Sequence, residues 1–287
     1  MAGVALAVVV TGCGVSTQQE VEMGQQYAQQ INQQLPIVQD PELNRYINVL
    51  GDSIARLTSR TDLPEWRFYI VDSKEVNAFA VPGGFVYVNR GLIERTQRMD
   101  QLAGVLGHEI GHVVRRHSIK QMQQQQGANI GVTLACVLTS ICNNQAGQTA
   151  IQVGGTALFA KFSRGDEAEA DEEGIRNVTR AGINPNGIPE MFQILIDERN
   201  SASGGAVASW FATHPLEEDR IAATRAIIAN YNPAIIRTLS TDSPNFQRFK
   251  ARDHGEAHVG VDDRKHTLGA DGVLVQRHRN RAQRRIK

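Results

Sequence analysis

The sequence lacks the compositional extremes that would by themselves assign a function. It carries 30 basic and 30 acidic side chains, so it has no net charge at pH 7 that would favour nucleic acid or an acidic partner. It contains only three cysteines, too few for more than one disulfide, and no internal repeat that would indicate a repeat architecture. With 41% hydrophobic and 21% charged residues, the 287-residue chain has the composition of an ordinary globular protein.

The charges are unevenly distributed along the chain. Residues 250–287 hold ten Lys/Arg against five Asp/Glu, together with four of the eight histidines and no aromatic residue. Because this segment also shows little apolar periodicity, we predict a disordered, solvated basic tail whose histidines are not ligands. Nucleic-acid binding by the tail is the alternative, but the solvated tail is favoured, and we predict no nucleic-acid partner.

The N-terminus has an apolar run, residues 2–10, that is too short to cross a bilayer as a helix. Small residues follow it and lead into Cys13, which predicts a lipoprotein signal peptide over 1–12 with Cys13 as the lipidated first residue of the mature chain. No Lys or Arg precedes the run, which departs from such signals, and a buried strand is the alternative. Gly14 in place of Asp favours the outer membrane in Gram-negative sorting, so we expect a lipid-anchored protein of the bacterial cell envelope, on its periplasmic face.

The other two cysteines, Cys136 and Cys142, are six residues apart. This spacing allows a disulfide across a turn but not along a straight helix. A disulfide would suit an oxidising compartment, and two free thiols are the alternative.

The most informative segment is His108-Glu-Ile-Gly-His112, which lies in a stretch that we predict to be a helix. Residues four apart share one face of a helix, so both imidazoles can bind one metal ion. Glu109 is then placed to act as general base on a water molecule at a zinc ion. Two buried, hydrogen-bonded core histidines are the alternative to a metal site.

The surroundings of this segment give further expectations. Asp100 is a candidate N-cap of the helix. The helix is apolar or small on nearly every side and should be buried, and its glycines at 104, 107 and 111 suggest that another part of the chain approaches its backbone closely. Residues 115–117, Arg-Arg-His, mark a polar exit from the helix.

A catalytic zinc requires a third protein ligand, and an acid-rich segment at 163–174 offers one. On a helix, Glu167, Asp171 and Val178 share one stripe, which we expect to be buried, whereas the other acids fall on a solvated face that includes Glu173. We therefore predict Glu167 as the third ligand. Asp171, one turn later, is expected to accept a hydrogen bond from the second nitrogen of a ligating histidine. An acid-rich surface helix is the alternative.

The remaining pattern predicts an α+β fold that is mainly α, with a small β-sheet beside the metal helix. Strands are expected at residues 66–71 and within 77–88, where Pro-Gly-Gly reads as a turn. Helices are expected at 18–35, from residue 41, over 163–180, 186–199 and 216–231, and as two segments within 128–162, with a Gln-rich loop at 121–127. The metallopeptidase domain is expected to span residues 13–240.

Four blocks in order resemble the HtpX, BepA/LoiP and CAAX prenyl protease family of zinc metallopeptidases. They are His-Glu-x-x-His at 108–112, Ser-Arg-x-x-Glu-x-x-Ala-Asp at 163–171, Asn-Ala-Phe-Ala with Pro-Gly-Gly at 77–84, and His-Pro-Leu-Glu-Glu-Asp-Arg at 214–220. The resemblance covers about residues 18–232, looks closest to the LoiP-like lipoprotein branch and implies a zincin-like core. No membrane-spanning segments or helical-repeat extension of the kind found in other members are evident.

The resemblance implies further roles for individual residues. One Zn²⁺ would be held by His108, His112 and Glu167, with His214 as a removable fourth ligand. Arg220 would stabilise the oxyanion of the tetrahedral intermediate. We also expect Asn77 at the substrate site, and the strand containing Phe85 and Tyr87 could pair with an extended substrate; an ordinary sheet strand is the alternative reading for that segment.

Two functions follow from these expectations. The first is a zinc metalloendopeptidase that degrades misfolded or misassembled envelope proteins, with the outer-membrane assembly machinery as a possible partner. The second is a zinc-stabilised chaperone or assembly factor whose protease activity is latent. An aminopeptidase is less favoured, because no acid that would bind a free amine is evident.

Overall fold

The computed structural model describes residues 15–125, 161–201, 204–215 and 218–255. The expected signal peptide with Cys13, the Cys136–Cys142 pair and most of the expected helices at 128–162 lie outside these residues. Within the described ranges, none of the helices combines the length and apolar character needed to cross a membrane.

A three-stranded sheet forms early in the chain, as predicted. It consists of β1 (Arg67–Val71), β2 (Ala78–Val81) and β3 (Phe85–Asn89) in the order β1-β3-β2, with β3 parallel to β1 and antiparallel to β2. The expected Pro-Gly-Gly turn joins β2 to β3, and its two glycines adopt φ of 83° and 96°, a backbone region that favours glycine. The mixed sheet confirms the predicted strands, although β1 begins one residue later and β3 ends one residue later than predicted.

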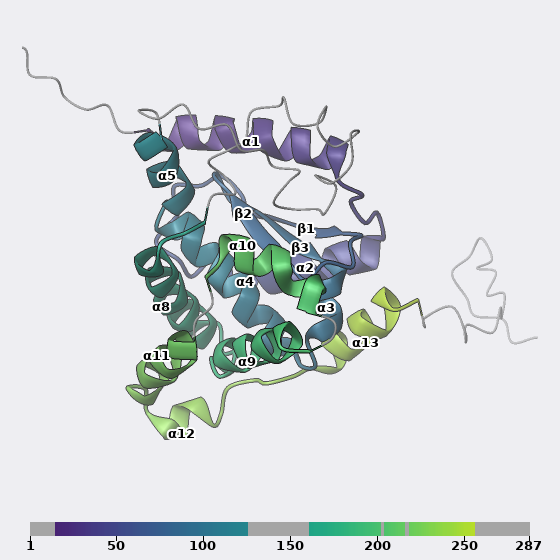
Figure 1. The fold of residues 1–287 in the computed structure, drawn as a ribbon, viewed down its shortest axis with the longest axis vertical. Coiled ribbons are helices and arrows are strands. Elements are labelled where there is room, and N and C mark those ends of the chain that lie inside the picture. The colour runs from purple at the N-terminus through teal and green to yellow at the C-terminus, as the bar shows by residue number, and fades with distance from the viewer. Residues whose placement is uncertain (1–14, 126–160, 202–203, 216–217, 256–287) are drawn as a thin grey trace, which may run out of the picture.

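Alternate residues of the strands point to opposite faces of the sheet, and each face is covered by helix. One face, which includes Phe79 and Tyr87, packs with Ala28 and Ile31 of α1 (Thr17–Gln34). The other face carries Val86 and packs into the main core with α2 (Pro41–Ala55) and α4 (Met99–Val114). Figure 1 shows α1 running along one side of the sheet, with most of the other helices on the other side.

The other regular elements of the described chain are helices, so the fold is α+β and mainly α, as predicted. The metal helix α4 is surrounded by neighbours and is buried continuously from Met99 to Val113. The other helices are α3 (Arg90–Arg95), α5 (His117–Gln125), α8 (Arg164–Arg180), α9 (Gly187–Arg199), the 3-10 helix η2 (Gly204–Val207), α10 (Ala208–Thr213), α11 (Glu218–Ala229), α12 (Pro233–Ile236) and α13 (Pro244–Asp253).

The glycines of α4 allow close approach of its neighbours, as the sequence suggested. A Cβ at Gly111 would lie 2.6 Å from the carbonyl oxygen of Ala170 on α8, and one at Gly107 would lie 2.8 Å from Val178 and 3.3 Å from the Cα of Gly174. Only residues without a Cβ can sit at such a helix crossing. The crossing brings the acidic stripe of α8 against the two histidines of α4.

Three predictions about element boundaries are corrected. Asp100 is not the N-cap: α4 begins at Met99 with Arg98 as its N-cap residue, and Asp100 lies in the first turn, where it accepts hydrogen bonds from Arg98. The Gln-rich segment is not a loop through 125, because it continues helix α5, whose residue types are good helix formers. Residues 250–253 belong to α13, which packs against α2, so the expected tail begins inside a helix.

Gly111→Ala is expected to lower the free energy of unfolding by about 1–3 kcal/mol, because the added methyl group would force α4 and α8 apart. Gly165→Ala is the matched control, since a Cβ there meets only the Ser163 hydroxyl at 3.6 Å and alanine favours helix by up to about 1 kcal/mol. Urea denaturation of both variants measures the difference. Equal stability of the two variants would contradict the close helix crossing.

Candidate metal centre

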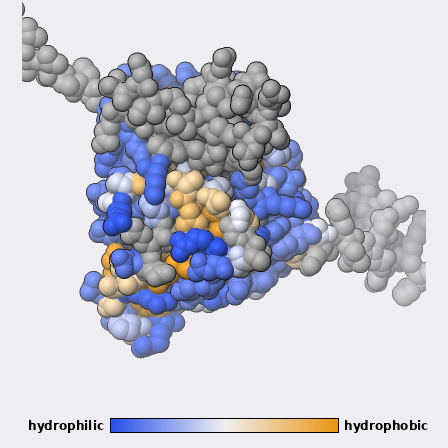
Figure 2. Space-filling model, viewed as in Figure 1, coloured by the Kyte–Doolittle hydropathy of each residue, from blue (hydrophilic) through white to orange (hydrophobic). Residues whose placement is uncertain are grey.

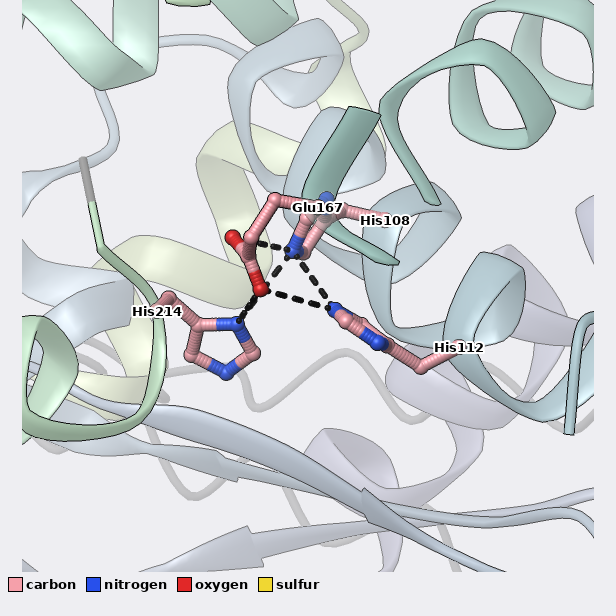
Figure 3. Close-up of side chains that lie close together, drawn as sticks. All are labelled: His108, His112, Glu167 and His214. Atoms are coloured by element: carbon pink, nitrogen blue, oxygen red, sulfur yellow. Dashed lines mark hydrogen bonds and ion pairs between the residues drawn. The ribbon is translucent and has the colours of Figure 1, made fainter. Parts of the chain in front are cut away.

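Four side chains from three parts of the chain converge at one buried point (Figure 3). His108 and His112 project from α4, Glu167 from the first turn of α8, and His214 from the C-terminal end of α10. One potential ligand atom from each lies within 4.8 Å of the others. The four residues are at most 2% exposed. The structure therefore brings together the three predicted metal ligands and the predicted optional fourth.

The nearest distances between the four residues are close to the ligand spacing of a tetrahedral zinc site. Nitrogen and oxygen ligands about 2.0–2.1 Å from zinc are about 3.3 Å apart in a tetrahedron. The Nε2 atoms of His108 and His112 are 3.0 Å apart. His108 Nε2 lies 3.6 Å from one carboxylate oxygen of Glu167, and His112 Nε2 lies 3.4 Å from the other. His214 Nδ1 lies 3.1 Å from Glu167 and 3.4 Å from His108 Nε2.

The electrostatics of the cluster also fit a cation. Burial lowers the pKa of His112 well below its usual value, so this imidazole is neutral and has a free lone pair. Burial alone would raise the pKa of Glu167, but His214, His112 and Arg220 hold it well below its usual value, so the carboxylate is charged. Neutral imidazole and ionised carboxylate are the forms that bind zinc.

Asp171 lies where it was predicted, directly behind a ligand. Its carboxylate accepts a hydrogen bond from His108 Nδ1 at 2.8 Å, which leaves Nε2 of that ring as a lone pair facing the cluster. The Arg220 guanidinium donates to both oxygens of Asp171 at 2.7 and 2.9 Å and also to Glu167. It stacks over the Phe192 ring at 4.5 Å. In this arrangement Arg220 fixes two carboxylates, and its oxyanion role stays a prediction.

Glu109 lies beside the cluster without belonging to it. Within the described part of the chain, both of its carboxylate oxygens are buried and have no hydrogen-bond partner. The closest charged neighbour is His214, whose Nε2 lies 3.6 Å from one oxygen. Burial raises the pKa of Glu109, and the carboxylates Glu167 and Glu109 raise the pKa of His214 although its burial opposes this. A buried acid that makes no hydrogen bond at this position is available for proton transfer.

Sequence reasoning missed three residues that contact the centre. His117 was expected in a polar exit, but it is fully buried, and its Nδ1 lies 2.9 Å from His112 Nδ1. Phe162 stacks on the His112 ring at 4.0 Å between centroids, and Trp210 stacks on His214 at 4.6 Å. The sequence did contain a hint of a role for His117, because it is the one histidine before residue 250 to which no role was assigned.

The predicted substrate strand is corrected. β3 lies between β1 and β2, so both of its edges are already hydrogen-bonded and it cannot accept an extended peptide. Phe85 and Tyr87 are buried on the face of the sheet covered by α1, where Tyr87 donates to Asn32 at 3.1 Å. Asn77 is buried and, among the described residues, its side-chain amide has no hydrogen-bond partner, so its substrate role stays a prediction.

The helical projection of the acidic segment is confirmed except at one position. Glu167, Asp171 and Val178 are buried as predicted. Glu173 was assigned to the solvated face but is only 6% exposed, and it pairs with Arg115 at the end of α4 at 3.0 Å.

A buried site with two histidines from one helix and a glutamate from a second helix defines a class of zinc metallopeptidase site. Residues 41–228 match the family described as Peptidase family M48. The chain therefore belongs to peptidase family M48, whose metalloproteases use zinc. This finding confirms the resemblance and the cofactor inferred from the four motif blocks.

Three relatives illustrate the similarity. The chain is 32% identical over 256 residues to the beta-barrel assembly-enhancing protease of Escherichia coli K12, covering 87% of this chain and 51% of that protein. It is 32% identical over 159 residues to metalloprotease YcaL of the same species, covering 55% and 60%. It is 30% identical over 176 residues to the mitochondrial metalloendopeptidase OMA1 of Schizosaccharomyces pombe, covering 61% and 50%. The chain spans about half the length of curated relatives that it matches.

Glu167→Ala is expected to weaken zinc binding strongly, because it removes a ligand. Loss of a residue that only hydrogen-bonds to a ligand weakens zinc binding by about 10–100-fold, and the effect of Glu167→Ala should be larger. Isothermal titration with zinc measures the affinity. Glu172→Ala is the matched control, since Glu172 is exposed on the same helix and pairs only with Arg176 among the described residues. Similar zinc affinity of both variants would contradict the assignment of Glu167.

Proposed function

We propose that this chain is a zinc-dependent metalloendopeptidase. The observation that carries the proposal is the buried Glu109 carboxylate, which has no hydrogen-bond partner among the described residues and lies beside the convergent His108, His112 and Glu167. When bound, zinc would supply Lewis acidity, which polarises a scissile carbonyl and lowers the pKa of water. The protein's own side chains would supply the proton transfer and the positioning.

In this proposal Glu109 is the general base. Its burial raises its pKa toward the range in which a carboxylate can both accept a proton from water and return it to a leaving amine. Arg220 holds the carboxylates of Glu167 and Asp171 in place, and Asp171 in turn fixes the ring of His108. The predicted oxyanion contact of Arg220 would require this guanidinium to reach the substrate as well.

His214 can block the coordination position that water or substrate would need at the metal. Its Nδ1 occupies the fourth corner of the cluster, and its Nε2 faces Glu109 at 3.6 Å. A catalytic zinc needs this corner for water or substrate. We infer that His214 leaves the cluster when substrate binds, and that the resting protein is inactive.

The proposed substrates are misfolded or misassembled proteins of the bacterial envelope. Some relatives are named beta-barrel assembly-enhancing protease, which supports a task beside the outer-membrane assembly machinery. Figure 2 shows a mostly hydrophilic face with apolar residues gathered near α10, the helix that directly precedes His214. An apolar surface beside the centre suits the exposed apolar side chains of an unfolded chain.

We further propose that the protein is tethered by lipid at Cys13, on the periplasmic face of the envelope and at its outer membrane. The apolar run and small residues before Cys13 support this location. Mass spectrometry of the membrane-extracted protein tests the lipid anchor directly, because it detects an acylated cysteine at the N-terminus.

Glu109→Gln is expected to keep zinc but to lower the rate of casein cleavage by about 10²–10⁴-fold, the usual contribution of general acid–base catalysis. Zinc content and cleavage rate are measured on the same preparation, with the exposed Glu172→Gln as the matched control. Cleavage at the wild-type rate would disprove the general-base assignment. Product analysis on an internally cleavable peptide separates endopeptidase from aminopeptidase activity.

His214→Ala is expected to raise peptidase activity, because it opens the fourth corner of the cluster. His254→Ala, an exposed position after α13, is the matched control. Lower activity of His214→Ala than of the wild type would show that His214 assists catalysis instead of closing the site. The chaperone alternative is favoured if a Glu109→Gln variant restores envelope integrity to cells that lack the protein.

A further inference from the structure

His117 is the fourth histidine of the described cluster around His112, and the mechanism above assigns it no role. It is completely buried at the start of α5, five residues after the ligand His112. Its Nδ1 lies 2.9 Å from His112 Nδ1, the ring nitrogen that faces away from the metal centre. On its other side, His117 Nε2 lies 3.4 Å from Glu169 and 3.5 Å from Asp166.

An unusual turn places His117 there. α4 ends at Val114, and Arg116 then adopts φ of 58°, the one positive value among non-glycine residues in the described ranges. Such a conformation persists only where its surroundings enforce it. Here the Arg116 guanidinium donates to the buried Glu20 at 2.8 Å and to the Val15 carbonyl at 2.6 Å.

The turn is also anchored from its other side. Arg60 donates to both oxygens of Glu20 at 3.0 and 3.1 Å and to the Val113 carbonyl at 3.0 Å. A buried carboxylate shared by two arginines therefore fixes the end of α4. The chain reverses at this point so that the His117 ring returns against His112.

The contact between the two rings determines where their protons lie. Two ring nitrogens 2.9 Å apart must be one donor and one acceptor. His112 Nε2 faces His108 and Glu167, so it must be a lone pair when a metal is held, and the proton of His112 is on Nδ1. His117 Nδ1 is then the acceptor, and its Nε2–H points at the carboxylates of Glu169 and Asp166.

We propose that His117 is a positioning residue of the metal centre, which fixes the tautomer and orientation of His112 through this hydrogen bond and is itself oriented by Glu169 and Asp166. The inference rests on the metal centre proposed above. With this hydrogen bond, the two ligand histidines differ in their outer partners. His108 donates to the carboxylate of Asp171, whereas His112 donates to the neutral imidazole of His117. Outer partners of this kind set ligand geometry and metal affinity.

The zinc affinity of variants of the full chain tests the proposal, by competition with a chromophoric chelator. His117→Leu, which removes the acceptor, is expected to weaken zinc binding by about 10–100-fold. His117→Asn, whose amide can still accept near the Nδ1 position, is expected to retain most of the affinity. Ile119→Ala is the matched control, because Ile119 is also buried on α5 and its loss destabilises the fold without removing a ring contact.

A second measurement needs no variant that could fail to fold. In the zinc-loaded, ¹⁵N-labelled wild type, we expect a coupling between Nδ1 of His112 and Nδ1 of His117 across the hydrogen bond, and a protected His112 Nδ1–H signal. Absence of this coupling, or equal zinc affinity of His117→Leu and the wild type, overturns the proposal. Failure of the wild type itself to bind zinc would instead refute the metal centre as a whole.

Discussion

The structure depends on one close contact, the crossing of α4 and α8 at Gly107, Gly111 and Gly174. No Cβ separates the two backbones there, so the first turns of α8 lie directly against His108 and His112. The ligand distances of 3.4–3.6 Å between these histidines and Glu167 are a consequence of that contact. A methyl group at the crossing would shift the acid by more than a zinc site tolerates.

The same contact buries charges that need compensation. Glu167 and Asp171 are removed from water at the crossing, and one guanidinium, Arg220, is shared between them. Two imidazole nitrogens also face each other at 3.0 Å across the cluster. A bound cation resolves this arrangement, because it satisfies both lone pairs and the carboxylate together. The site is therefore organised for a metal, and the surrounding hydrogen bonds orient its side chains.

The sequence predicted those parts of the site that depend only on the spacing of residues along one helix. The spacing of four in the His-Glu-x-x-His run and the helical stripe of α8 predicted the three residues that the structure brings together, His108, His112 and Glu167, and also Asp171. What escaped prediction depends on tertiary contacts. The burial of His117 follows from the turn at Arg116, which Glu20 stabilises from 96 residues away in the chain. The central position of β3 follows from strand order, which alternation along a strand does not encode.

The most direct test of the central claim is the X-ray absorption spectrum of the purified, zinc-loaded chain. We expect only nitrogen and oxygen ligands, at about 2.0–2.1 Å from the zinc, with the imidazole scattering of at least two histidines. A shell of sulfur at about 2.3 Å would place the metal at cysteine instead. That result, or a chain that retains no zinc, would contradict the site formed by His108, His112 and Glu167.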